Sequence, residues 1–82
     1  MRTRDEVLSL IRNHLASELE VDVRRIGETT RFKEDLDADS LDLYALVQEL
    51  EDVYGIRIPD EEAQEIATVG QAADFVLAHS ER

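Results

Sequence analysis

Residues 40–55 read Ser-Leu-Asp-Leu-Tyr-Ala-Leu-Val-Gln-Glu-Leu-Glu-Asp-Val-Tyr-Gly, and this stretch decides the fold class. Its apolar side chains recur at three- and four-residue steps, which is the spacing of one buried helix face. The apolar positions are Leu43, Leu46, Val47, Leu50, Val53 and Tyr54. Gly55 follows where a left-handed C-terminal cap belongs. The stretch therefore predicts a helix that begins at Ser40 and ends before Gly55.

Helical signals lie on both sides of this stretch. Upstream, Thr3-x-x-Glu6 is a capping box, and the apolar residues after it predict a helix over about residues 4–17 that frays toward Glu20. Downstream, Pro59-Asp60-Glu61-Glu62 predicts a short helix, and Thr68-x-x-Gln71 is a capping box that opens a last helix. No strand pair is visible. We therefore expect an all-α fold, a small four-helix bundle with three longer helices and one short helix, as a single domain over residues 1–82.

A long connection, residues 21–39, joins the first two predicted helices. It carries isolated apolar residues, of which Phe32 and Leu36 are expected to pin it to the core. A long loop without secondary structure inside a compact domain is usually functional. This loop is therefore the first place to look for a site.

Composition excludes several classes of function. The 82 residues are 43% apolar and 35% charged, which suits a folded domain. Nine Lys and Arg against 20 Asp and Glu give a net charge of −11, which argues against nucleic acid as a partner. The absence of cysteine excludes disulfides, thiolate zinc sites and a cysteine nucleophile. No apolar run approaches the about 20 residues of a membrane span, and no signal peptide is visible. We expect a soluble, cytoplasmic monomer, and the small size suits an acceptor or scaffold that lends its surface to other proteins better than a self-sufficient enzyme.

The negative charge is confined to one part of the chain. Residues 1–33 carry a net charge of +1, whereas residues 34–82 carry −12. A one-sided field of this kind favours a basic partner surface and fast, steered encounter. An acidic surface also keeps a small protein soluble, so charge alone leaves both interpretations open.

The densest polar feature is Asp35-Leu36-Asp37-Ala38-Asp39-Ser40-Leu41-Asp42. As a calcium loop it fails, because Ser40 replaces the glycine of position 6 and Leu46 replaces the glutamate of position 12; a weak divalent-ion site stays open. Catalysis by Ser40 lacks a G-x-S-x-G elbow, and the two histidines, His14 and His79, lie in other predicted helices. Neither a sensor nor a hydrolase is favoured.

Two interpretations of Ser40 remain. As a helix N-cap it would explain the acids nearby, but not the long loop before it. As an acceptor of a covalent group it would present its hydroxyl at a helix N-terminus, where a phosphodiester meets free N–H groups and the positive end of the helix dipole.

At these residues the chain resembles a known family. The segment from Phe32 to Asp42 is similar to the phosphopantetheine attachment segment of bacterial acyl carrier proteins. Residues 50–62, with their Ile-x-Ile-Pro-Asp-Glu-Glu pattern, and Ile66-Ala67-Thr68-Val69 resemble the same family, so the similarity covers about residues 7–76. Two positions depart from the family pattern: Asp37 replaces a usual glycine, which aspartate tolerates in the left-handed region, and Ala45 replaces a common glutamate.

The resemblance implies a function. A phosphopantetheinyl transferase would esterify Ser40 to 4′-phosphopantetheine, whose thiol would carry growing acyl chains between the enzymes of fatty acid biosynthesis. The protein itself would not be an enzyme. Basic patches on those enzymes would meet the predicted helix that begins at Ser40, through the docking residues Asp39, Leu41, Asp42, Glu51 and Asp52. An acyl pocket would be lined by Val47, Leu50, Ile58, Ile66 and Val69, which would serve equally as core. The alternatives are a carrier for a polyketide or other specialised pathway, and a non-covalent acidic interaction module.

Overall fold

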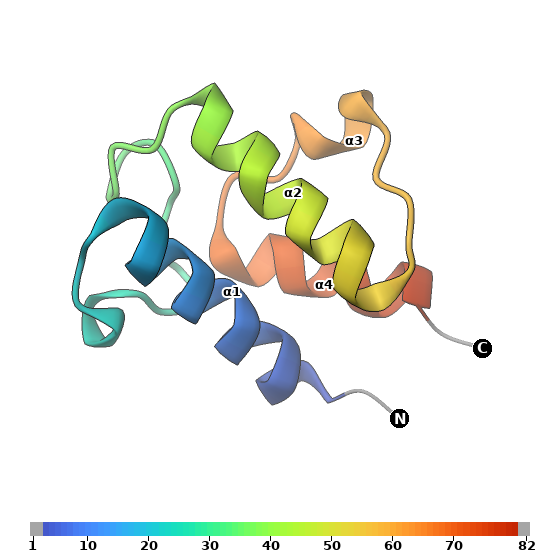
Figure 1. Cartoon of the computed structure of the whole chain (residues 1–82), viewed down its shortest axis with the longest axis horizontal. Helices are drawn as coiled ribbons and strands as arrows, with labels where there is room; N and C mark the ends of the chain where they lie inside the picture. The colour runs from blue at the N-terminus through green and yellow to red at the C-terminus, as the bar shows by residue number, and fades with distance from the viewer. Residues whose placement is uncertain (1–2, 81–82) are drawn as a thin grey trace.

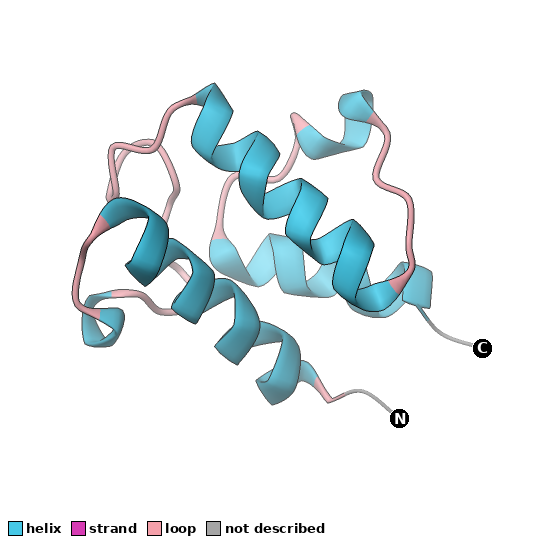
Figure 2. Ribbon diagram, in the orientation of Figure 1, coloured by secondary structure: helices cyan, strands magenta, loops and turns pink. Residues whose placement is uncertain are grey.

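The structure, a computed structural model, describes residues 3–80, which form helices and one isolated β-bridge (Figure 2). The elements are α1 (Arg4–Leu19), the 3-10 helix η1 (Val23–Arg25), α2 (Ser40–Tyr54), α3 (Asp60–Ala63) and α4 (Val69–Ser80). The predicted all-α bundle of three longer helices and one short helix is confirmed, with the long loop between α1 and α2. In Figure 1, α1 and α3 lie on opposite sides of α2.

The helix ends follow from local sequence. At the start of α1, the Thr3 hydroxyl accepts from the Glu6 N–H at 3.2 Å, and the Glu6 carboxylate accepts from the Thr3 N–H at 3.1 Å. α1 runs two residues past its predicted end because Glu20 takes a left-handed conformation (φ 57°) and its N–H bonds to the Ala16 carbonyl. Gly55, with φ 64°, caps α2 as predicted. These caps set the lengths of the two helices that frame the loop.

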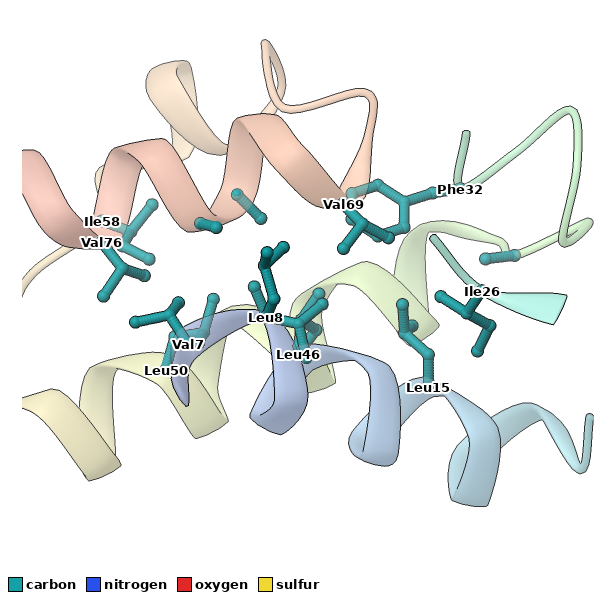
Figure 3. Packing of buried hydrophobic residues seen from close by; sticks show 14 residues of the cluster. Val7, Leu8, Leu15, Ile26, Phe32, Leu46, Leu50, Ile58, Val69 and Val76 are labelled. Carbon is teal, nitrogen blue, oxygen red and sulfur yellow. The ribbon is translucent and has the colours of Figure 1, made fainter. Parts of the chain in front are cut away.

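The core forms where α1, α2 and α4 meet (Figure 3). α1 packs chiefly against α4, and α2 contacts both of them. The loop between α1 and α2 adds Ile26 and Phe32, each 1% exposed, and the partly buried Leu36 packs against the same cluster. The two predicted loop anchors are therefore confirmed. Burying an aromatic ring and an isoleucine from the loop ties its path to the helices.

Backbone hydrogen bonds attach the same loop to the start of α4. The Phe32 N–H donates to the Ala67 carbonyl at 3.0 Å, and the Gly70 N–H donates to the Glu28 carbonyl at 2.8 Å. A Cβ atom at position 70 would lie 3.1 Å from that Glu28 oxygen, so a larger residue would require the Glu28 backbone to shift by a few tenths of an ångström. This pairing, which includes the bridge between Arg31 and Thr68, was not predicted because its partners are far apart in sequence.

Arginine side chains of α1 complete the attachment of the loop. Arg12 donates from Nε to the Ile26 carbonyl at 2.6 Å and from Nη2 to the Val23 carbonyl at 3.1 Å. Arg4 pairs with Glu28 of the loop at 2.6 Å and with Asp74 of α4.

No helix within residues 3–80 combines the length and apolar character needed to cross a membrane.

Candidate functional site

The first turn of α2 is closed by two aspartates. The Asp39 carboxylate accepts from the Asp42 N–H at 3.0 Å, and the Asp42 carboxylate accepts from the Asp39 N–H at 3.1 Å. Asp39 is thus the N-cap, and Ser40 is the first residue of the helix proper. The interpretation of Ser40 as the N-cap is wrong, because a carboxylate one position earlier already fills that role.

Ser40 is exposed, and its hydroxyl makes no hydrogen bond with any residue between 3 and 80. The backbone N–H groups of Ser40 and Leu41 are likewise without an acceptor within these residues, whereas the N–H of Leu43 reaches the Asp39 carbonyl at 3.2 Å. A helix leaves its first N–H groups unpaired and concentrates positive potential there. The geometry presents a free hydroxyl beside two free donors.

The residues before α2 form a tight turn. The Ala38 N–H donates to the Phe32 carbonyl at 2.9 Å, the Asp37 N–H donates to the Lys33 carbonyl at 3.1 Å, and Asp37 has φ 56°. Aspartate is therefore in the left-handed region, as expected where the family usually has glycine. The turn brings the backbone of Lys33 next to the residues that lead into Ser40.

Asp35 stabilises this turn from outside. Its carboxylate accepts from the Arg31 N–H at 2.8 Å and pairs with the Arg31 guanidinium at 3.3 Å. The backbone hydrogen bond from Arg31, followed by the hydrogen bond from its side chain, lowers the pKa of Asp35 below its ordinary value of 3.8. The loop therefore carries an ionised carboxylate fixed in place a few residues before Ser40.

The five predicted docking residues all lie on α2 or at its N-cap, but their surroundings differ. Leu41 is 75% exposed and Asp52 is exposed, while Asp39 and Asp42 take part in the cap. Glu51 accepts from the Ile58 N–H at 2.8 Å and so holds the connection between α2 and α3. Three of the four acids thus have structural hydrogen bonds, which the sequence pattern did not indicate.

A cavity of about 590 Å³ opens beside Ser40, between the loop, α2 and the segment around α3. Its apolar lining side chains are Phe32, Leu43, Val47, Ala63, Ile66 and Ala67. Ser40 and Tyr44 also line it, together with charged and amide side chains: Lys33, Glu34, Asp60 and Gln64. The apolar part of this lining, next to a free hydroxyl, suits the apolar portion of a ligand attached there.

The predicted acyl-pocket residues separate into two groups. Val47 and Ile66 line this cavity. Leu50, Ile58 and Val69 lie in the core with exposures of 1%, 4% and 0%, and none of them lines the cavity. Sequence reasoning missed Leu43 and Tyr44, although their spacing of three and four residues from Ser40 places them on its face of the helix. It missed Lys33 and Gln64 because no local pattern reveals their proximity.

Other chemistries find little support in this region. Between residues 3 and 80, no three His, Cys, Asp or Glu side chains converge as metal ligands. His14 and His79 lie on α1 and α4, and neither of them lines the cavity beside Ser40. His79 instead stacks on Phe75, with 3.9 Å between ring centroids. The hydroxyl of Ser40 therefore has no histidine base beside it in this structure.

Comparisons with known proteins agree with this geometry. Residues 9–76 match the family model described as a phosphopantetheine attachment site. The chain is 47% identical over 76 residues to the acyl carrier protein of Rubrobacter xylanophilus, covering 93% of this chain and 94% of that protein. It is 43% identical over 77 residues to the acyl carrier protein of Lactobacillus acidophilus, covering 94% and 96%.

A solved structure shows the same fold. The acyl carrier protein from Enterococcus faecalis matches with a TM-score of 0.80 at 35% sequence identity, covering 94% of this chain and 98% of that one. The prosthetic group of this family is phosphopantetheine. Because both the family model and the relatives span nearly the whole chain, the protein belongs to the acyl carrier protein family.

Proposed function

We propose that Ser40 carries 4′-phosphopantetheine and that the protein transports acyl chains for fatty acid biosynthesis. The observation that carries this proposal is the division of roles at the start of α2. Asp39 and Asp42 form the cap, so the hydroxyl of Ser40 is exposed and unbonded within the described part of the chain. A serine needed for capping would be engaged with its own helix, and this one is not.

The surroundings of Ser40 fit a phosphodiester. The unpaired N–H groups of Ser40 and Leu41 are placed to donate to phosphate oxygens, and the N-terminal end of α2 favours a negative group. The cavity lined by Val47 and Ile66 lies next to the same hydroxyl. The arm supplies a terminal thiol that holds an acyl chain as a thioester, a chemistry that a chain without cysteine lacks.

A carrier role also agrees with what the site lacks. Attachment to Ser40 requires activation of its hydroxyl, and no histidine lines the cavity beside it. The neighbouring carboxylates of Asp39 and Asp42 would oppose an alkoxide in the resting protein. We infer that a separate phosphopantetheinyl transferase supplies the base and that the protein acts as a substrate of other enzymes rather than as an enzyme itself.

Docking to those enzymes would use the exposed side of α2. Leu41, 75% exposed beside Ser40, offers an apolar contact, and Asp52 offers a carboxylate for which no hydrogen bond or ion pair is found within residues 3–80. Asp39, Asp42 and Glu51 add negative charge to this surface. Each of them also accepts a backbone hydrogen bond that stabilises one end of α2. A surface of this sign attracts basic partner patches and speeds their encounter.

Fatty acid biosynthesis is the pathway that we propose, and a monomeric, cytoplasmic protein remains our expectation.

The acyl chain would enter the cavity beside Ser40. Its apolar lining side chains come from the loop, from α2 and from the segment that includes α3, so an acyl chain carried on the arm finds apolar surface close to the attachment point. We keep Val47 and Ile66 as pocket residues and add Leu43 and Ala63. Leu50, Ile58 and Val69 would take part only if the core opened, since each is at most 4% exposed.

The decisive experiment is attachment of the arm in vitro. Incubation with a phosphopantetheinyl transferase and coenzyme A should add the mass of one arm to the wild-type chain, and Ser40→Ala should abolish the addition. Ser17→Ala, which removes an exposed hydroxyl from α1, should be modified like wild type. Absence of the added mass in the wild-type chain, or its persistence in Ser40→Ala, would overturn the proposal. A non-covalent interaction module would bind basic partners equally well with either residue at position 40.

The pathway is tested with the loaded protein. The holo protein should support chain elongation by a reconstituted bacterial fatty acid synthase, whereas Ser40→Ala should not. Loading without elongation would favour the polyketide or other specialised alternative.

A further inference from the structure

We propose that Lys33 is a positioning residue that pairs with the phosphate of the arm and holds the arm over the cavity beside Ser40. This inference rests on the proposed function. It assigns a role to a side chain that lines the same cavity as Ser40 and belongs to neither the docking residues nor the apolar pocket.

Lys33 is exposed and has no ion pair with any residue between 3 and 80, although acidic residues follow it directly in sequence. Glu34 and Asp35, its neighbours, are instead drawn to Arg31, at 3.6 Å and 3.3 Å. The tight turn before α2 brings Lys33 next to the residues that lead to Ser40 through the hydrogen bond from the Asp37 N–H to the Lys33 carbonyl. A lysine without an ion pair within the described residues thus lines the same cavity as Ser40, and the turn fixes its backbone.

The charges around Ser40 make such a cation useful. Glu34 and Asp60 line the cavity, and Asp39 and Asp42 flank the serine, so a phosphodiester there lies among carboxylates. Lys33 is the cation among the cavity's lining residues. The free N–H groups of Ser40 and Leu41 supply donors, and a full positive charge adds to them by offsetting the nearby carboxylates. Lysine binds phosphate as a flexible point charge, which suits an exposed site.

The consequence concerns where the arm points. A phosphate held by Lys33 keeps the arm on the side of α2 where the cavity opens, rather than free in solvent. An exposed ion pair shifts an equilibrium by about two- to fivefold, so the arm would favour the cavity side without being locked there. That bias leaves the arm free to enter a partner enzyme.

Magnetic resonance of the apo and holo proteins tests this directly. The side-chain ammonium resonance of Lys33 should shift when the arm is attached, and the phosphorus resonance of the holo protein should shift and sharpen in Lys33→Gln. Lys33→Arg should keep the wild-type phosphorus signal. Arg57→Gln, which removes an exposed cation from the connection between α2 and α3, is the matched control and should leave it unchanged. Raising the ionic strength from about 0.05 to about 0.5 M should reduce the difference between the phosphorus resonances of the wild-type and Lys33→Gln holo proteins, because exposed pairs are screened.

The outcomes separate this inference from the proposed function. If mass spectrometry shows the arm on Ser40 but the Lys33 resonance does not change on attachment, or the phosphorus signal of Lys33→Gln equals that of wild type, the positioning role is overturned alone. If no arm is attached to Ser40, the proposed function fails and this inference fails with it. Equal phosphorus shifts in Lys33→Gln and Arg57→Gln would show a general effect of net charge and would likewise overturn the pairing.

Discussion

The two ends of α2 use acidic side chains in different ways. At the N-terminal end, Asp39 and Asp42 bond to each other's backbone N–H groups, so the interaction is confined to one turn. At the C-terminal end, Glu51 reaches across Gly55 to the Ile58 N–H, which belongs to the chain leading into α3. One end is closed locally, and the other holds two elements together.

The difference explains why the hydroxyl of Ser40 is left free at the N-terminal end. A local cap satisfies the first turn of α2 without using Ser40, whose hydroxyl remains exposed. The other end is covered by the returning chain, and its carboxylate is half-buried. Substitutions that remove an acid therefore test different properties at the two ends, and a docking role is isolated only by changes that preserve the hydrogen bonds.

The largest effect is expected at Glu51. Glu51→Ala should lower the free energy of unfolding by about 1–3 kcal/mol, because the buried Ile58 N–H loses its acceptor. Glu51→Gln keeps an acceptor oxygen and should retain most of the stability. Urea unfolding of the apo proteins measures both variants. A stability of Glu51→Ala equal to that of wild type would show that this end of α2 does not depend on the carboxylate.

A smaller loss of stability is expected at Asp39. Asp39→Ala should cost about 1 kcal/mol, because it removes the side chain that accepts from the Asp42 N–H. Asp39→Asn keeps an acceptor for that N–H and removes the charge, so its stability should remain close to that of wild type. Urea unfolding of the two apo variants measures the difference.

The same pair of variants separates capping from docking at the N-terminal end. If Asp39 also meets basic partners, Asp39→Asn should slow attachment of the arm at low salt and less so at high salt, because exposed charges are screened over about 8–10 Å. Slowing that is independent of salt would contradict a docking charge at this position.

Local signals were enough for most of the fold. The capping boxes at Thr3 and Thr68 and the left-handed Gly55 each depend on residues within a few positions, and the structure contains all three. The N-cap of α2 was not predicted, because only Ser40 was considered for that role although aspartate is an equally good capping residue. Asp42 decides between the two residues, because its carboxylate lies three residues after Asp39 and returns the hydrogen bond.

The features of the fold and of the site that local signals did not predict depend on contacts between segments that are distant in sequence. Val47 and Leu50 lie on the same helix and are both apolar, yet Val47 lines the cavity while Leu50 is 1% exposed in the core. What distinguishes them is where the segment around α3 lies against α2, and no spacing within α2 encodes that. For the same reason the hydrogen bond between Glu51 and Ile58, and the place of Lys33 beside Ser40, appear only in the folded chain.

The smallest effect is expected in the loop that leads into the N-terminal end of α2. Hydrogen bonds from Arg31 lower the pKa of Asp35, so its stabilising contribution is fully present above the unfolded-state value of about 3.8 and is lost as the pH falls through the lower folded-state value. Asp35→Asn should therefore lower the Tm by about 1–3 °C at pH 7, and the gap should narrow as the pH falls below 3.8 and the carboxylate becomes protonated. Glu34→Gln, which removes a charge from the same turn but only a longer contact of 3.6 Å with Arg31, should change the Tm less. A gap between Asp35→Asn and wild type that does not narrow as the pH falls below 3.8 would mean that the ionised carboxylate does not stabilise this loop.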